Sequence, residues 1–223
     1  METRNYDHTV ELRADGEAER IHGTAIVFYD QTPDTEFVLW DDRGQYEGGV
    51  KMVERIMPSA MAGRMKDDIR ALVNHDPSLL LGRSNGKTKT LRLSKDDDGL
   101  HYEIEPSKTR LHEDTIESIR RGDMTGSSFA FTIAPKGQRF KDEGDDVTVR
   151  EITKFAKVFD VSPVTFPAYQ GTDAGVRDAD AVKEARDAFT AHRDAVEAEA
   201  AAQAKAVEER IAGMNLRIDK LEE

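Results

Sequence analysis

Short apolar or alternating segments fill most of the chain up to about residue 164, and they predict strands more often than helices. The clearest segments are rich in β-branched or aromatic residues and are bounded by polar or glycine-containing turns. They span residues 24–29, 50–56, 88–93, 100–104 and 127–133. A further segment, 147–164, is too long for one straight strand and is expected to bend. We therefore predict a mainly β body with helices (α+β), a closed or nearly closed β-barrel wrapped by helices.

The segments between these strands carry turn and helix signals. An Asp-Gly step at Asp98–Gly99 predicts a hairpin between 88–93 and 100–104. Short helices are expected over 58–65, which Pro58 opens, and over 114–121, which Gly122 ends. The charged, glycine-containing stretch 135–146 is expected to be a mobile connection.

The composition changes near residue 178, after which there is no proline and one glycine, Gly213. Ala, Glu, Asp, Lys and Arg dominate this part, which favours helix. From Val207 to Leu221 the apolar residues recur at alternating steps of four and three, the pattern of a short coiled-coil seam. We expect a domain over 1–177 and a charged helical tail over 178–223. The tail is either a solvated helix or one that pairs with itself or a partner protein.

Charge and composition exclude several classes of function. The 223 residues include 32 Lys plus Arg against 44 Asp plus Glu, a net charge of -12. A net negative charge of this size repels polyanions, so neither a nucleic acid nor an anionic membrane surface is an expected partner. The chain has no cysteine and therefore no thiol nucleophile, disulfide or thiolate zinc site. Without a signal peptide or an apolar run of spanning length, the expectation is a cytoplasmic protein.

The strand predicted over 127–133 separates its side chains onto two faces. One face carries Ser127 followed by two phenylalanines and an isoleucine, and it is the predicted core face. The other carries Ser128, Ala130 and Thr132, all small, which leaves room for a group to approach the Ser128 hydroxyl. Ser128 is therefore the better candidate nucleophile. The alternative is that its hydroxyl only forms a hydrogen bond within the sheet.

Among six histidines, His75 is the preferred partner for such a serine. It follows the apolar run 69–73 and lies in a loop bounded by Pro77 and Gly82, where reactive groups are common. His22, at the start of the first strand, stays open as an alternative. Metal-binding histidine spacings, a calcium loop and a phosphate-binding loop are all missing from the sequence, so we expect no metal and no cofactor.

Four blocks of the sequence resemble the tailed-phage prohead serine proteases, over about residues 20–172. The segment 72–76, with Leu81–Arg83 and Asp98–Leu100 after it, is similar to the histidine motif of that family. Segment 121–131 is similar to its serine motif, with Ala130 in place of a glycine. Segments 158–169 and 54–60 resemble two further blocks.

This resemblance implies a serine endopeptidase that processes capsid and scaffold proteins during prohead maturation, with self-cleavage. Its fold would resemble the herpesvirus capsid protease. The resemblance gives Ser128 as nucleophile and His75 as general base, with Asp160 as the preferred third member and Glu151 in reserve. The partners would be the major capsid protein and its scaffold segment, inside the procapsid in the host cytoplasm.

Two points stay open on the sequence alone. The donors for the oxyanion would be backbone N–H groups near 126–129 or the side chain of Arg150. A rival function is a non-catalytic capsid assembly protein that keeps the β body as a scaffold module. A small-ester hydrolase is a weaker option, since the sequence has no Gly-x-Ser-x-Gly motif.

Overall fold

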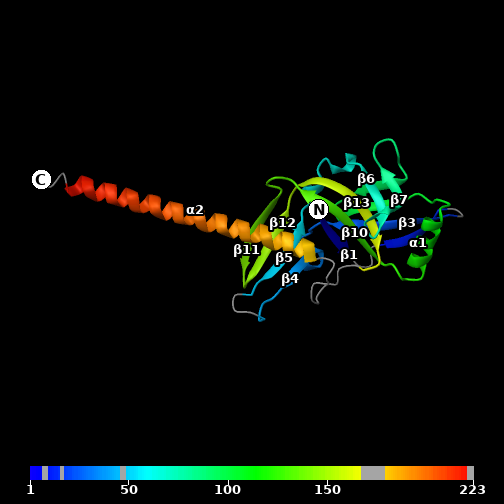
Figure 1. Cartoon of the computed structure of the whole chain (residues 1–223), viewed down its shortest axis with the longest axis horizontal. Helices are drawn as coiled ribbons and strands as arrows, with labels where there is room; N and C mark the ends of the chain where they lie inside the picture. Colours follow the sequence, from blue (N-terminus) through cyan, green and yellow to red (C-terminus); the bar gives the residue numbers. More distant parts are fainter. Residues whose placement is uncertain (7–9, 16–17, 46–48, 167–178, 220–223) are drawn as a thin grey trace. The chain divides into compact units, whose positions relative to one another are not determined.

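The structure is a computed structural model that describes all residues except 7–9, 16–17, 46–48, 167–178 and 220–223 (Figure 1). The chain divides into two compact units, Met1–Val182 and Lys183–Glu223. The proposed domain boundary at 177/178 lies outside the described residues, as do residues 167–169 of the third sequence block and Leu221 of the coiled-coil pattern.

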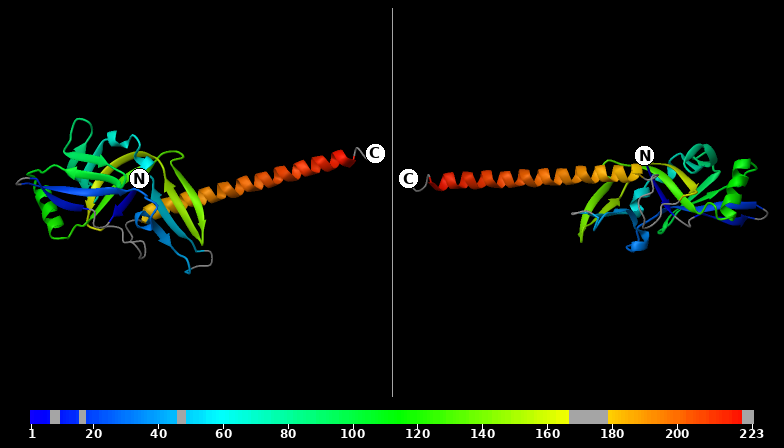
Figure 2. Two further views of the ribbon diagram at one scale, coloured as in Figure 1. Left: turned by 180° about the vertical axis from the view of Figure 1, so that it is seen from behind. Right: turned by 60° about the horizontal axis from the view of Figure 1, so that its bottom comes forward.

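The strands described in the first unit form three sheets (Figure 1 and Figure 2). The first has the order β1 (Glu2–Tyr6), β10 (Gly126–Ile133), β13 (Phe155–Val164), β6 (Ile69–Val73), β7 (Asp76–Ser84). The second has the order β11 (Gln138–Gly144), β12 (Val147–Ile152), β5 (Lys51–Ile56), β4 (Phe37–Asp41). The third has the order β2 (Val10–Asp15), β3 (Ala18–Val27), β9 (Gly99–Ile104), β8 (Leu91–Lys95).

The prediction of a closed barrel wrapped by helices is wrong. None of the three sheets closes on itself within the part of the chain that is described. A barrel needs one unbroken ladder of strand pairs. Here the segment predicted as one bent strand divides instead: β12 pairs with β5 in the second sheet, while β13 pairs with β10 and β6 in the first. The helices in the described residues before 167 are also few, an α-helix α1 (Arg110–Arg120) and short 3₁₀ turns.

Other local predictions met mixed outcomes. The hairpin β8–β9 is confirmed, and the Asp96 carboxylate accepts hydrogen bonds from the N–H groups of Asp98 and Gly99 in its turn. The helix expected over 58–65 is instead two 3₁₀ turns, η2 (Pro58–Met61) and η3 (Arg64–Lys66), with Gly63 at φ +78° before the second. The expected mobile connection 135–146 contains strand β11, whose charged residues suit an exposed sheet edge.

The predicted core face of β10 is confirmed. The rings of Phe129 and Phe131 are fully buried and stack with centroids 4.8 Å apart, and Phe155 of β13 packs against both. On the same face, the Ser127 hydroxyl forms a 2.8 Å hydrogen bond with the hydroxyl of Tyr102. Burial raises the pKa of Tyr102 well above its ordinary value, so this hydroxyl stays neutral. These contacts fix the orientation of β10 and turn the Ser128 side chain to the opposite face.

A buried quartet of charged side chains binds β1 to the second sheet. Glu2 and Arg4 of β1 meet Glu54 of β5 and Arg150 of β12, and each of the four is 7 % exposed or less. Positive and negative side chains alternate around the quartet. Arg4 binds Glu54 at 2.5 Å and Glu2 at 2.7 Å, and Arg150 binds Glu2 at 2.8 Å and Glu54 at 2.9 Å. Burial alone raises the pKa of Glu2, but the bonds and charges of Arg150 and Arg4 outweigh it and hold that pKa below its ordinary value.

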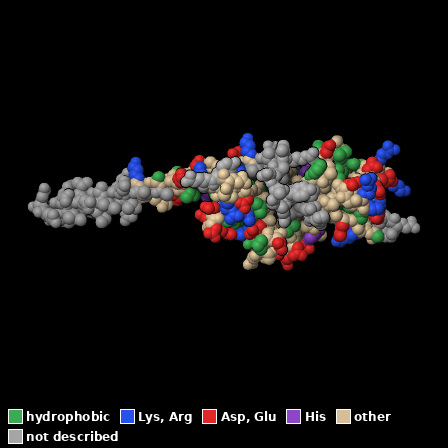
Figure 3. All heavy atoms as spheres, turned by 90° about the horizontal axis from the view of Figure 1, so that it is seen from below, with side chains coloured by type: hydrophobic (Ala, Val, Ile, Leu, Met, Phe, Trp, Pro, Cys, Tyr) green, Lys and Arg blue, Asp and Glu red, His purple; other side chains and the backbone are tan. Residues whose placement is uncertain are grey.

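In the part of the chain expected to form a helical tail, the structure has one helix, α2 (Ala179–Asp219), 41 residues long. None of the helices in the described ranges is long and apolar enough to cross a membrane. In the first unit, basic and acidic side chains are interspersed over the face seen in Figure 3, as expected for a solvated surface.

Candidate active site

Three neighbouring strands of the first sheet bring the candidate residues together. Ser128, in the middle of β10, lies opposite Ser162 of β13 in the antiparallel register, and Ala130 lies opposite Asp160. On the far side of β13, strand β6 runs parallel to it and ends at Val73. His75 therefore follows directly from the strand that neighbours the one carrying Asp160.

The imidazole of His75 bridges a hydroxyl and a carboxylate. Its Nδ1 lies 2.6 Å from Asp160 Oδ1, and its Nε2 lies 2.5 Å from Ser128 Oγ. With the carboxylate accepting from Nδ1–H, Nε2 is left as the acceptor for the Ser128 hydroxyl proton. Ser128 is fully buried and Asp160 is 4 % exposed, while the His75 side chain is 20 % exposed. Solvent therefore reaches the row formed by Ser128, His75 and Asp160 at the imidazole.

A tight turn between β6 and β7 holds His75 in place. Asn74 and His75 have φ values of +52° and +59°, a left-handed conformation that asparagine tolerates better than most residues. The Asn74 side chain bonds the end of β13 in both directions: its Nδ2 donates to Thr165 Oγ1 at 3.1 Å, and its Oδ1 accepts from the Thr165 N–H at 2.9 Å. The Asn74 N–H also donates to the Pro163 carbonyl. The turn is thus fixed to the strand that carries Asp160.

The structure does not bring the reserve carboxylate, Glu151, to this row. Glu151 lies on β12 in the second sheet, where its carboxylate binds Arg139 and Lys141. Arg150, named as a possible oxyanion donor, is 1 % exposed and belongs to the buried quartet.

Three further residues at this row were missed by the sequence analysis. The Ser162 hydroxyl is fully buried and donates to Asp160 Oδ1 at 2.9 Å, which adds a second donor to that oxygen. Its signal was present, because residues two apart in a strand share a face. Thr165 and Asn5, which lies opposite Ser128 on β1, join the row through pairings between distant segments.

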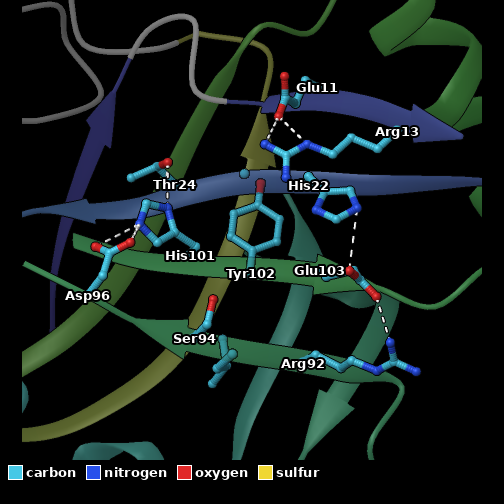
Figure 4. A pocket seen from close by; sticks show the side chains of 12 residues that line it. Glu11, Arg13, His22, Thr24, Arg92, Ser94, Asp96, His101, Tyr102 and Glu103 are labelled. Carbon is cyan, nitrogen blue, oxygen red and sulfur yellow. Dashed lines mark hydrogen bonds and ion pairs between the residues drawn. The ribbon is translucent and has the colours of Figure 1, made fainter. Parts of the chain in front are cut away.

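Neither His22 nor His101 joins this row of groups. His22 and His101 border a cavity of about 600 Å³ on the third sheet, and none of His75, Ser128 and Asp160 lines it (Figure 4). The charged groups there bind one another, Arg92 with Glu103 and His101 with Asp96. Burial lowers the pKa of His22, which favours its neutral form. This is the pattern of a charged sheet face in solvent.

A hydroxyl, an imidazole and a carboxylate bonded in this order form the arrangement that serine hydrolases use. The family model of the caudovirus prohead serine protease matches residues 8–185 of the chain. The chain belongs to this family of serine peptidases, which confirms the resemblance seen in the sequence blocks. A comparison with the curated proteins gave no match, and neither did a comparison with the solved structures.

Proposed function

We propose that this prohead protease cleaves peptide bonds with Ser128 as nucleophile, His75 as general base and Asp160 as the carboxylate that orients the imidazole. The observation that supports it is the pair of short contacts, 2.5 Å and 2.6 Å, that join the three side chains through the two nitrogens of His75. A carboxylate on Nδ1 holds the required tautomer and stabilises the imidazolium once it forms.

The reaction would proceed in two steps. The Ser128 Oγ attacks the scissile carbonyl carbon as its proton passes to His75 Nε2, and the carbonyl electron pair moves to oxygen. When that oxygen re-forms its double bond, the C–N bond breaks, and Nε2 returns the proton to the leaving amine. Water then repeats the sequence on the acyl-enzyme, and the carboxylic acid product leaves Ser128 free.

The family supports a substrate found in the prohead, namely the major capsid protein with its scaffold segment, processed inside the procapsid in the host cell. Self-cleavage is part of the same proposal. For the tail, we propose that it pairs through the apolar pattern that the sequence shows over Val207–Leu221, with a second copy or with a scaffold helix. The non-catalytic assembly protein is the rival, and it has no need for a bonded hydroxyl, imidazole and carboxylate.

Labelling with a fluorophosphonate, which reacts with activated serine hydroxyls, tests the nucleophile directly. We expect one adduct by intact-mass measurement and its position at Ser128 by peptide mapping, because His75 activates that hydroxyl alone. The acid-unfolded chain is the control and should stay unlabelled. An adduct on Ser127 or Ser162 contradicts the assignment, and a folded chain that takes no label while leaving co-expressed capsid protein uncut supports the assembly protein.

The turn that carries His75 gives a second prediction. Replacing Asn74 with glycine keeps the left-handed backbone accessible but removes both bonds to Thr165. We expect the labelling rate of Ser128 to fall by up to about 10²-fold, since a small displacement of a catalytic group has effects of that size. Thr165→Val, which removes one of the two bonds, should have a smaller effect. Equal rates in Asn74→Gly and the unmodified chain would show that the turn needs no such support.

A further inference from the structure

Cleavage by Ser128 also needs a hydrogen-bond donor for the carbonyl oxygen, which becomes negatively charged in the transition state. The backbone N–H groups of residues 127–129 are poor candidates. Strand β10 is flanked by antiparallel partners on both sides over this stretch, β1 and β13, and ladder hydrogen bonds use these groups. Gly126 is two residues before Ser128, about 7 Å along the strand. Arg150 is committed to Glu2 and Glu54.

A side-chain donor lies beside Ser128 on β1. Asn5 is the antiparallel partner of Ser128, and partners in such a pair point to the same face of the sheet with Cβ atoms about 4.5–5.5 Å apart. His75 reaches Ser128 from the other side, over β13, where Ser162 is the partner. The register therefore puts Ser128 between Asn5 on β1 and Ser162 on β13, and the imidazole reaches the Ser128 hydroxyl from the β13 side. A carbonyl attacked by Ser128 can direct its oxygen away from the base and toward Asn5.

The hydrogen bonding of the Asn5 side-chain amide is that of a donor available to a ligand. Its Oδ1 is buried and has no hydrogen-bond partner, an arrangement that lowers stability and is rare in folded proteins. Its Nδ2 donates to the Phe166 carbonyl over 3.4 Å, a long and weak bond in an exposed setting. The second N–H of this amide has no acceptor among the described residues. The amide thus holds its donor by one weak bond and leaves its acceptor without a partner.

We propose that Asn5 Nδ2 donates a hydrogen bond to the oxyanion formed when Ser128 attacks a peptide carbonyl. The inference rests on the proposed function of Ser128. Asn5 precedes the region matched by the family model, residues 8–185. It follows that β1, held in place by the buried quartet, completes the active site of this chain.

The test compares Asn5→Ala and Asn5→Asp with the matched control Thr3→Ala. Thr3 lies on the same strand and the same face, opposite Ala130 instead of Ser128. The rate of Ser128 phosphonylation by the fluorophosphonate and the processing of co-expressed capsid protein are measured, with thermal unfolding as the check on folding. We expect both Asn5 variants to lose about 10²–10³-fold in rate, the usual effect of removing one oxyanion donor, and Thr3→Ala to lose little.

The isosteric Asn5→Asp variant tests the N–H donor of residue 5 independently of the size of the side chain and of its acceptor oxygen. It keeps the size and an acceptor oxygen but has no N–H, so a rate near that of the unmodified chain would overturn the proposal. Asn5→Ala within about threefold of the unmodified rate in a folded chain would do the same. Failure of the Ser128 assignment is recognised separately, because the unmodified chain would then carry its label elsewhere or not at all.

Discussion

Ser128→Ala is expected to abolish processing of a co-expressed capsid protein while the chain remains folded. The substitution removes the oxygen that is bonded to His75 Nε2. The nearby Ser162 hydroxyl lies on the Nδ1 side of the ring instead, where it donates to Asp160. Removing the nucleophile of a comparable serine protease lowers kcat by about 10⁶-fold, so no product should appear on the time scale of co-expression. Intact-mass measurement of the capsid protein, with and without the chain, detects the loss.

The adjacent serine supplies the control. Ser127 lies on the opposite face of β10 and bonds Tyr102 in the core. Ser127→Ala should therefore retain processing, although leaving the buried Tyr102 hydroxyl without its partner costs about 1–3 kcal/mol of the free energy of unfolding. Processing at the same capsid sites by the Ser128→Ala chain would exclude Ser128 as the nucleophile. Loss of processing in both variants would point to the stability of β10 instead of its chemistry.

The residues of the candidate site were predictable where their signals are local. Period-two alternation in β10 selects Ser128 over Ser127, and the structure places Ser128 against His75 and Ser127 in the core. The sequence left two carboxylates open, since Asp160 and Glu151 lie in one predicted strand. The family resemblance favoured Asp160, and the structure distinguishes the two by dividing that segment between two sheets. Asn5 carries no local signal, because its place beside Ser128 depends on a pairing across 123 positions of sequence.

The fold was predictable at the level of strands and not of sheets. Segments 100–104 and 127–133 became β9 and β10 nearly as predicted, since their side-chain pattern alone specifies a strand. Which strands pair is decided by contacts between distant segments, and these gave open sheets instead of a barrel. The charged strand β11 was missed because its side chains carry no apolar alternation, and Arg139 and Lys141 find their partner, Glu151, only across the ladder.

Strand β1 connects the stability of the fold with the proposed chemistry. Asn5 lies beside Ser128, while Glu2 and Arg4 of the same short strand enter the quartet with Glu54 and Arg150. An edge strand of five residues has few ladder bonds of its own. The ion pairs are therefore expected to decide how firmly β1, and with it the Asn5 amide, is held against β10.

Glu54→Leu should lower the free energy of unfolding by about 3–5 kcal/mol, because it leaves Arg4 and Arg150 buried with one carboxylate between them. Urea unfolding measures the loss, and Glu11→Leu is the control, since the Glu11–Arg13 pair is exposed and contributes at most about 1 kcal/mol.

Hydrogen exchange should also show residues 2–6 losing protection before the rest of the first sheet. Equal losses in the two variants would mean that the quartet does not hold β1. Early release of β1 in Glu54→Leu, together with slower labelling of Ser128 in the chains that stay folded, would connect the quartet to the active site through Asn5.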